Sequence, residues 1–343
     1  MNAADLTAVA RQLVAGDKGL LAMDESIATC NRRFAALGIP QTEPARRAWR
    51  ELLITSPRLS ACISGAILCD ETFQQSTAAG APFTQVLAAA GILSGVKVDA
   101  GAVYLAGHPG ETVTEGLDGL RARLAAYVRQ GARFAKWRAV IAVGDRLPTL
   151  GCIDANAHAL ARYAALCQEA GLVPIVEPEV LMTGGHSLSA CRDATECVLR
   201  GVFDQLQRQR VLLEGMLLKP NMVLPGLGCP AQETVDAVAD ATVDTLMRVV
   251  PAAVPGIVFL SGGQSGELAT ARLNAMNLRR ETRGARLPWA LSFSFGRALQ
   301  HPALELWRGE AANVIPSQQA LLHRAACNRA ARRGAYGPAM DAA

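Results

Sequence analysis

The chain of 343 residues has no long hydrophobic run and no paired cysteine motif. Because no run of 18 consecutive apolar residues occurs, the sequence predicts no membrane-spanning helix. The nine cysteines include no C-x-x-C pair and no His/Cys cluster at zinc spacing, which indicates buried thiols in a reducing compartment. The N-terminal segment lacks the apolar region of a secretory signal, so we expect a cytoplasmic protein.

Clusters of basic residues are also missing. The chain carries 34 Lys plus Arg against 30 Asp plus Glu, a formal charge of +4, with no run of five or more basic residues. This weak, scattered charge offers no electrostatic footprint for DNA or RNA, so we expect no nucleic-acid partner. Hydrophobic residues make up 50% of the chain and charged residues 19%, which excludes disorder and predicts a globular protein with a large core.

Short apolar runs alternate with longer segments of helical period. The runs are residues 19–25, 61–70, 94–99, 133–140, 172–180, 215–221, 256–263 and 289–296. Hydrophobic strands alternating with helices predict a parallel sheet, and eight units in about 280 residues favour a closed (β/α)8 barrel over an open doubly wound sheet. We predict an α/β fold with one TIM-barrel domain over 1–343. It consists of a leading helix in 1–17, the barrel in 18–297, and C-terminal helices with a short tail in 298–343, whose last ten residues are frayed.

Lysine is unusually rare, since only four of the 34 basic residues are lysine. Three of the four, Lys97, Lys136 and Lys219, lie within apolar runs that read as strands. A desolvated lysine can lose its proton and act as a nucleophile, whereas an arginine cannot. Lys219, between Leu218 and Pro220, is expected either to form a salt bridge or to have a lowered pKa, and the second state suits Schiff-base chemistry.

Two carboxylates, Glu177 and Glu179, lie two residues apart on one predicted strand and therefore share a face. Close carboxylates drive their pKa values apart, which would equip one of them as a proton shuttle. Structural ion pairing with Lys136 and Lys219 is the competing interpretation, and it does not exclude catalysis. Arg138 shares the face of Lys136 and would further disfavour the lysine ammonium.

The loops after the seventh and eighth predicted strands are typical phosphate sites in this architecture. They contain backbone N–H groups, glycines that permit close approach and one arginine: Ser261, Gly262, Gly263, Gly296 and Arg297. A second anion could bind across the mouth at the segment Ser26–Thr29 with Lys97 and Arg138, although an ion pair with Asp99 is an equally good interpretation of Lys97. These features predict a substrate with two phosphates and a carbonyl that condenses with lysine.

The chain closely resembles the class I, Schiff-base-forming fructose-1,6-bisphosphate aldolases. The matching stretches cover roughly residues 18–300 and read LLAMDES, GVKVD, LAGHPGETVTEGLDGL, FAKWR, ARYAALCQEAGLVPIVEPE, LLKPNMVLPG, FLSGGQS and FSFGRALQ. The resemblance implies reversible cleavage of fructose 1,6-bisphosphate to dihydroxyacetone phosphate and glyceraldehyde 3-phosphate, in glycolysis, gluconeogenesis or carbon fixation. It also implies a homotetramer with no cofactor and no metal. The five scattered histidines agree, because they argue against the zinc-dependent type of aldolase.

The resemblance also implies roles for individual residues. Lys219 would form the iminium with the ketone half, Glu177 would be the main general acid/base, and Asp24 with Lys136 would assist carbon–carbon cleavage and dehydration. Glu179 would lie beside them as a supporting charge. The ketone-half phosphate would bind to Ser261, Gly262, Gly263, Gly296 and Arg297, and the other phosphate to Ser26, Thr29, Lys97 and Arg138.

Two departures from the family pattern affect these expectations. After the first strand the family usually has S-T-G-S, whereas this chain has S-I-A-T-C, so the second phosphate site is expected to shift. The chain also ends at M-D-A-A without the flexible tail and terminal tyrosine of the animal enzymes, and Tyr336 lies too early to replace it. Two alternatives are another Schiff-base aldolase or transaldolase acting on a sugar monophosphate, and a non-catalytic barrel scaffold. Retention of Lys219 and Glu177 argues against the scaffold.

Overall fold

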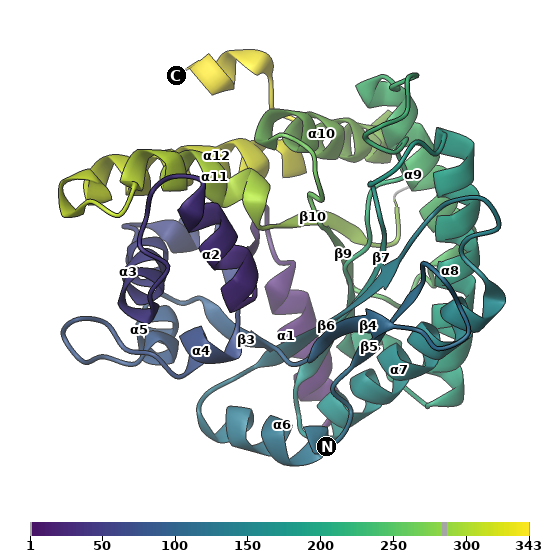
Figure 1. Cartoon of the computed structure of the whole chain (residues 1–343), viewed down its shortest axis with the longest axis horizontal. Coiled ribbons are helices and arrows are strands. Elements are labelled where there is room, and N and C mark those ends of the chain that lie inside the picture. The colour runs from purple at the N-terminus through teal and green to yellow at the C-terminus, as the bar shows by residue number, and fades with distance from the viewer. Residues whose placement is uncertain (1, 283–286, 343) are drawn as a thin grey trace.

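Eight parallel strands close into a barrel in the computed structural model, which describes residues 2–282 and 287–342 (Figure 1). In barrel order they are β1 Gly19–Met23, β10 Ala290–Phe295, β9 Gly256–Phe259, β8 Leu217–Leu218, β7 Val173–Val180, β6 Phe134–Ile141, β3 Leu93–Lys97 and β2 Ile63–Leu68. Each lies within or within one residue of a predicted run, so the barrel prediction is confirmed. β8 is shorter than its predicted run 215–221, because Pro220 has no N–H to continue the ladder.

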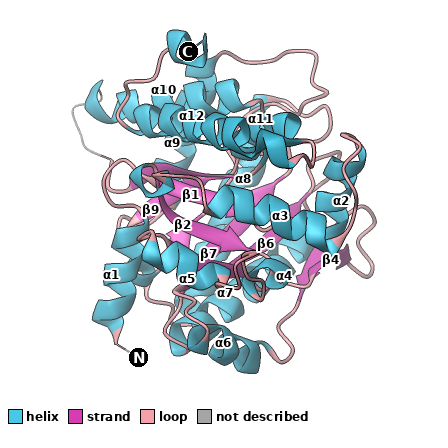
Figure 2. Cartoon of the chain, turned by 90° about the vertical axis from the view of Figure 1, so that its left-hand side faces the viewer, coloured by secondary structure: helices cyan, strands magenta, loops and turns pink. Residues whose placement is uncertain are grey.

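Helices surround the barrel in both views of the ribbon (Figures 1 and 2). They are α1 Ala3–Leu13, α2 Ile27–Ala35, α3 Glu43–Ile54, α4 Asp70–Phe73, α5 Phe83–Ala89, α6 Leu120–Arg129, α7 Leu150–Glu169, α8 Leu188–Arg208, α9 Val235–Val249, α10 Gly266–Thr282, α11 Arg297–Trp307 and α12 Val314–Arg332. Short 3-10 helices span Leu59–Ala61, Leu213–Gly215, Ala311–Asn313 and Pro338–Ala342. Within the described residues, no helix is both long enough and apolar enough to cross a bilayer.

The predicted leading helix is α1, and it closes one end of the barrel. Asn2 caps it by accepting a hydrogen bond from the N–H of Ala4, and its buried face includes Leu6 and Leu13. These side chains pack with inward-facing strand residues such as Phe134 and Ile175 in one apolar cluster. A second, larger cluster fills the space between the strands and the outer helices. The active side chains must therefore come from the other end of the strands.

Side-chain alternation along the strands makes that other end polar. On β7 the inward face begins with the apolar Val173 and Ile175, and the same period of two continues to Glu177 and Glu179. On β6 the inward Phe134 is followed by Lys136 and Arg138 in the same way. The inner face thus changes from apolar to charged toward the C-terminal ends of the strands.

A two-stranded antiparallel hairpin, absent from the sequence-based prediction, follows β3. It consists of β4 Gly101–Tyr104 and β5 Thr112–Glu115. The hydroxyl of Thr114 donates to the carbonyl oxygen of Arg138 at 2.8 Å, and the hydroxyl of Thr112 donates to the carbonyl oxygen of Val140 at 3.1 Å. The hairpin therefore braces the part of β6 that carries Arg138.

The chain end is more ordered than predicted. Residues 338–342 form a 3-10 helix in which Asp341 binds both the Arg324 guanidinium and the Tyr336 hydroxyl. The backbone N–H of Tyr336 also donates to the Asn274 side chain at 2.9 Å. The prediction of frayed residues is therefore wrong for 334–342, because buried and half-buried polar groups anchor this segment. Residue 343 lies outside the described residues.

Candidate active site

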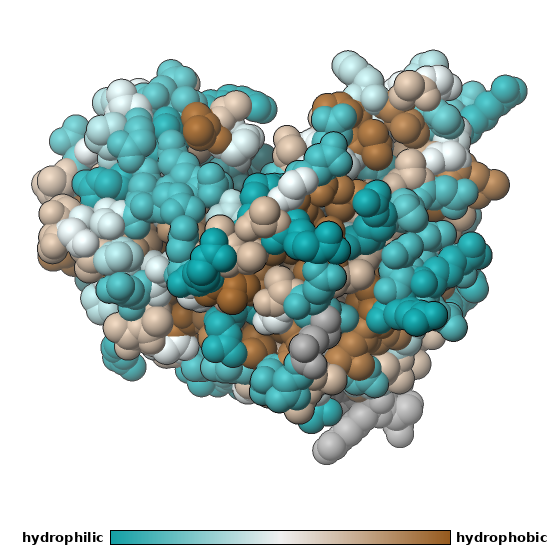
Figure 3. All heavy atoms as spheres, turned by 90° about the horizontal axis from the view of Figure 1, so that it is seen from below, coloured by the Kyte–Doolittle hydropathy of each residue, from teal (hydrophilic) through white to brown (hydrophobic). Residues whose placement is uncertain are grey.

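A cavity of about 590 Å³ opens at the C-terminal ends of the strands, and every residue predicted for the site lines it. A space-filling view from below shows a deep notch in the outline of the molecule (Figure 3). The residues are Asp24, Ser26, Thr29, Lys97, Lys136, Arg138, Glu177, Glu179, Lys219, Ser261, Gly262, Gly263, Gly296 and Arg297. Segments more than 270 residues apart in the chain, from Asp24 to Arg297, thus share one cavity.

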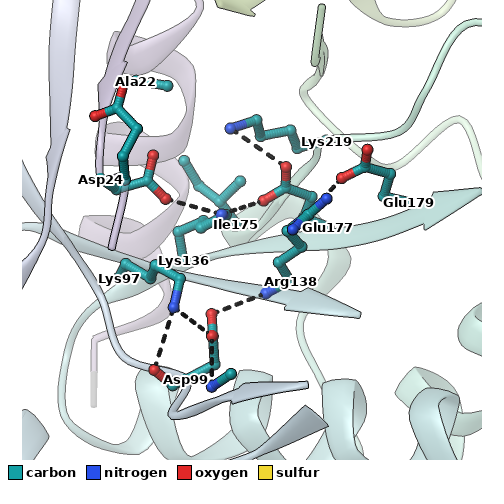
Figure 4. Close-up of polar contacts among 12 residues, drawn as sticks. Ala22, Asp24, Lys97, Asp99, Lys136, Arg138, Ile175, Glu177, Glu179 and Lys219 are labelled. Atoms are coloured by element: carbon teal, nitrogen blue, oxygen red, sulfur yellow. Dashed lines mark hydrogen bonds and ion pairs between the residues drawn. The ribbon is translucent and has the colours of Figure 1, made fainter. Parts of the chain in front are cut away.

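Four buried charged side chains occupy the centre of the cavity (Figure 4). Lys136 Nζ donates to Asp24 Oδ2 at 2.8 Å and lies 2.6 Å from Glu177 Oε2. Lys219 Nζ lies 3.4 Å from the other oxygen, Glu177 Oε1. Glu177 therefore contacts both lysines and can pass a proton between either amine and a bound molecule.

Burial and neighbouring charges perturb these groups strongly. Burial lowers the pKa of Lys219 below its ordinary value, and the nearby Arg138 guanidinium lowers it further, against the opposing effect of Asp24 and Glu179. Burial likewise lowers the pKa of Lys136 to about 8, although Asp24 opposes the shift. Burial alone would raise the pKa of Asp24, but the Lys136 and Lys219 ammonium groups hold it well below its usual range. The site thus keeps Asp24 ionised and weakens the hold of both amines on their protons.

Where β8 ends, the chain holds Lys219 in the mouth. Its backbone N–H donates to the carbonyl oxygen of Val176 at 2.8 Å, so it continues the ladder one residue past β8. Asn221 then joins this segment to β7, because its Oδ1 accepts from the N–H of Val180 at 3.0 Å. Lys219 is 3% exposed, which leaves its amine reachable only through the cavity.

Two further ion pairs lie beside the central group. Arg138 Nε is 2.5 Å from Glu179 Oε2, and the Arg138 side chain is the more exposed partner. Lys97 pairs with Asp99, whose second oxygen accepts from the backbone N–H of Arg138 at 3.2 Å. The sequence left open whether Lys97 forms an ion pair or binds an anion; it forms the pair and also lines the cavity.

The loop after β9 offers a row of unpaired donors. Among the hydrogen bonds of the described residues, the backbone N–H groups of Ser261, Gly262 and Gly263 donate to no acceptor. Gly262 has φ +57°, and a Cβ there would lie 2.4 Å from Met182 Sδ, so this position requires glycine. Gly296 and Arg297 lie at the start of α11, after the neighbouring strand β10, and the N-terminus of this helix adds a partial positive charge. This rim suits a phosphate.

The segment after β1 is the N-terminus of α2. Ser26 caps the helix by accepting from the N–H of Thr29 at 3.3 Å, and its hydroxyl donates to the Thr29 hydroxyl at 3.1 Å. Arg32 and Arg33, one helical turn further on, also line the cavity. Sequence reasoning missed both. Their spacing from Thr29 on a predicted helix was the available signal, but nothing separated them from the other arginines.

The sequence analysis also missed the ion pairs and hydrogen bonds of Glu25, the residue after Asp24. Glu25 accepts from Arg33 at 2.5 Å and from the Gln300 amide at 2.9 Å, and it lies 2.7 Å from the buried Arg50 guanidinium. Ser294, 1% exposed, lines the cavity with a hydroxyl that has no partner among the described residues. Its place two residues before Gly296 on β10 was the signal for an inward-facing hydroxyl.

A second group of possible ligands lies away from this cavity. His323 and Cys327 on α12 lie close to Asp341, so these three side chains could hold a metal ion. Both carboxylate oxygens of Asp341 already bind Arg324 and Tyr336, however. Tyr336 is not among the residues that line the active-site cavity.

The chain is similar to known proteins over nearly its whole length. The family model of class I fructose-bisphosphate aldolase matches residues 5–343. The probable fructose-bisphosphate aldolase class 1 of Xylella fastidiosa (strain Temecula1) is 55% identical over 98% of this chain and 99% of its own length. The cytoplasmic isozyme of fructose-bisphosphate aldolase from Cicer arietinum is 52% identical over 97% and 91%. A solved structure of the Plasmodium falciparum aldolase, in complex with TRAP and a small-molecule inhibitor, superposes with a TM-score of 0.95 at 46% identity, covering 98% and 96%.

Proposed function

The chain belongs to the class I fructose-bisphosphate aldolase family, whose reaction is the reversible aldol cleavage of fructose 1,6-bisphosphate, and we propose that Lys219 carries this reaction through a Schiff base. Membership confirms the resemblance drawn from the motifs and does not favour the monophosphate or scaffold alternatives. The observation that carries the proposal is the buried Lys219 amine at the end of β8, 3.4 Å from Glu177 and with a lowered pKa.

The proposed reaction begins when the Lys219 amine adds to the C2 carbonyl of the sugar, and loss of water leaves a protonated imine. A base then takes the proton of the C4 hydroxyl, the C3–C4 bond breaks, and its electron pair moves into the imine to form an enamine. Glyceraldehyde 3-phosphate leaves as the aldehyde. Protonation of the enamine carbon and hydrolysis of the imine release dihydroxyacetone phosphate and free the lysine.

The neighbouring charges have distinct roles in this scheme. Glu177 exchanges the protons of water loss and of the C4 hydroxyl, because it reaches both the Lys219 amine and the cavity. Lys136 balances the charges of Glu177 and Asp24, and Lys136 together with Asp24 assists both steps. Glu179 supports the site through its ion pair with Arg138. The imine, as an electron sink, makes the cleavage feasible.

Two rims of the cavity would hold the two phosphates. The unpaired N–H groups of the loop after β9, together with Gly296 and Arg297, suit the phosphate of the ketone half. The other phosphate would bind at the start of α2 with Ser26 and Thr29, and with Lys97 and Arg138. Arg32 and Arg33 add positive charge on the α2 side.

Borohydride trapping tests the nucleophile. With dihydroxyacetone phosphate present, reduction should attach the ketose covalently to Lys219, as read by mass spectrometry of the tryptic peptide. Lys219→Arg, which keeps the charge and cannot form the imine, is the matched control. EDTA should leave cleavage of fructose 1,6-bisphosphate unchanged. A label on Lys136, or strong inhibition by EDTA, would contradict the proposed mechanism.

The proposal also covers the domain organisation, the compartment and the assembly of the enzyme. We place all 343 residues in a single domain and the enzyme in the cytoplasm as a homotetramer, in line with the cytoplasmic isozymes among its plant relatives. Light scattering coupled to size-exclusion chromatography measures the assembly, and a monomeric mass at micromolar concentration would contradict it.

A further inference from the structure

Behind the loop after β9 lies a buried cation that the proposed mechanism does not use. Arg272, on α10, is 3% exposed. No carboxylate of the described residues pairs with its guanidinium, and its Nε has no hydrogen-bond partner there. Burial, with no compensating charge, lowers the pKa of Arg272. A buried cation without a counter-ion costs free energy, so a bound anion is the group that would balance it.

A short relay connects Arg272 to the loop. Arg272 Nη1 donates to Gln264 Oε1 at 2.8 Å. Gln264 donates to the Ser261 carbonyl oxygen twice, from its side-chain amide at 3.1 Å and from its backbone N–H at 3.2 Å. These bonds fix the turn that presents the unpaired N–H groups of Ser261, Gly262 and Gly263. Arg272 thus holds the turn from behind through one side chain.

The position of Arg272 in α10 strengthens the electrostatic argument. The helix begins at Gly266, and side chains on a helix lean toward its N-terminus, as the bond from Arg272 back to Gln264 shows. A cation is unfavourable at this end of a helix, because the helix dipole is positive there. The loop, the helix end and the guanidinium therefore place three sources of positive potential together, with no anion among the described protein groups that the guanidinium contacts.

We propose that Arg272 is a positioning residue for the ketone-half phosphate, holding the Ser261–Gly263 turn through Gln264 and supplying charge that the bound phosphate balances. The inference rests on the proposed function in assigning this loop to dihydroxyacetone phosphate. It predicts that Arg272 weakens the empty fold and strengthens the phosphate complex. A merely structural arginine would stabilise both.

The test separates the two substrates of the condensation reaction. Arg272→Met keeps the length of the side chain and removes the charge. It should raise the KM for dihydroxyacetone phosphate about three- to tenfold, with kcat and the KM for glyceraldehyde 3-phosphate each within about twofold of wild type. Arg272→Lys, which keeps the charge, should restore the KM for dihydroxyacetone phosphate to within about threefold.

Thermal unfolding provides a readout that does not depend on turnover. Without ligand, the Tm of Arg272→Met should equal or exceed that of wild type, because an uncompensated buried charge is gone. Inorganic phosphate should raise the Tm of wild type more than that of the variant. Arg324→Met is the contrast: Arg324 is equally buried but pairs with Asp341 and Glu267, so its loss should lower the Tm.

Each outcome decides the inference. Equal Tm losses in Arg272→Met and Arg324→Met, equal KM changes for both substrates, or a phosphate-induced Tm shift that the variant retains in full would overturn it. If wild type fails to cleave fructose 1,6-bisphosphate, the proposed function fails, and the phosphate-induced Tm shift still judges Arg272 independently.

Discussion

Glu177→Gln is the most informative single change in the central cluster. The carboxylate is 3% exposed, 2.6 Å from Lys136 Nζ and 3.4 Å from Lys219 Nζ. Removing one partner of a buried ion pair costs about 3–5 kcal/mol. Here the amide oxygen still accepts one hydrogen bond and Asp24 still binds Lys136, so we expect a loss of about 1–3 kcal/mol in the free energy of unfolding, a folded protein and a Tm lower by a few degrees.

The chemical effect should be much larger than the effect on stability. General acid/base catalysis contributes about 100- to 10,000-fold, so kcat should fall by that order. Borohydride trapping at Lys219 should be slower but still reach completion, because Glu177 only assists the loss of water, and loss of its charge lowers the pKa of both lysines further and favours the neutral amine. The assay compares kcat, trapping and Tm in the same preparations.

Glu179→Gln is the matched control, since Glu179 pairs with Arg138 rather than with a lysine. Its kcat should fall less than that of Glu177→Gln. If Glu177→Gln unfolds, or traps no ketose even after long incubation with dihydroxyacetone phosphate, the residue supports the fold or the Lys219 amine rather than the proton transfers. A kcat within about tenfold of wild type would transfer the acid/base role to Asp24 or Glu179.

Three further results are expected. Arg297→Ala should weaken the binding of both fructose 1-phosphate and the bisphosphate. Arg138→Ala should shift the kcat/KM ratio toward the monophosphate, which lacks the phosphate assigned to Arg138, and only roughly tenfold, because the ion pair with Glu179 at 2.5 Å already neutralises part of the Arg138 charge. Equal losses for the two substrates would reassign Arg138 to the reacting centre. The pKa of Lys136 is lowered from 10.5 to about 8, so between pH 8 and 10.5 the unfolded chain binds more protons at this residue than the folded chain does. Stability against urea should therefore rise with pH in that window, and Lys136→Met should remove the rise. Leu13→Ala should cost about 2–5 kcal/mol of stability while leaving KM unchanged, because Leu13 is fully buried at the closed end of the barrel.

The fold was predictable because the strand period of two residues and the helical period of 3.6 residues are both visible in short segments of the sequence. Alternation with a period of two places Ile175 and Glu177 on one face of β7, and an apolar run of strand length places β7 inside a parallel sheet. Once eight such strands close into a barrel, their C-terminal ends meet, so the residues at those ends form one site. The scarcity of lysine then singled out Lys97, Lys136 and Lys219 without any knowledge of their neighbours.

The missed features depend on contacts that no local pattern records. The Gln300 bond to Glu25 joins residues 275 positions apart. Arg33 resembles every other arginine in the chain until the turn of α2 brings it to the cavity. The β4–β5 hairpin was missed because its strands are only four residues long and nearly all of their residues are exposed or half-buried, so that they show no clear apolar alternation.

The geometry supports the proposal that Lys219, rather than Lys136, is the nucleophile. Lys136 makes both short contacts, at 2.8 Å to Asp24 and 2.6 Å to Glu177, whereas Lys219 has a single contact at 3.4 Å. An ammonium held by two carboxylates resists losing its proton, and the positive charge of Lys136 in turn disfavours a second ammonium beside it. Lys136 thus acts as the counter-ion of both carboxylates, which leaves Lys219 as the amine with the weaker hold on its proton. Because this assignment uses only distances and charge, a borohydride label on Lys136 would contradict it even if the reaction itself proceeds.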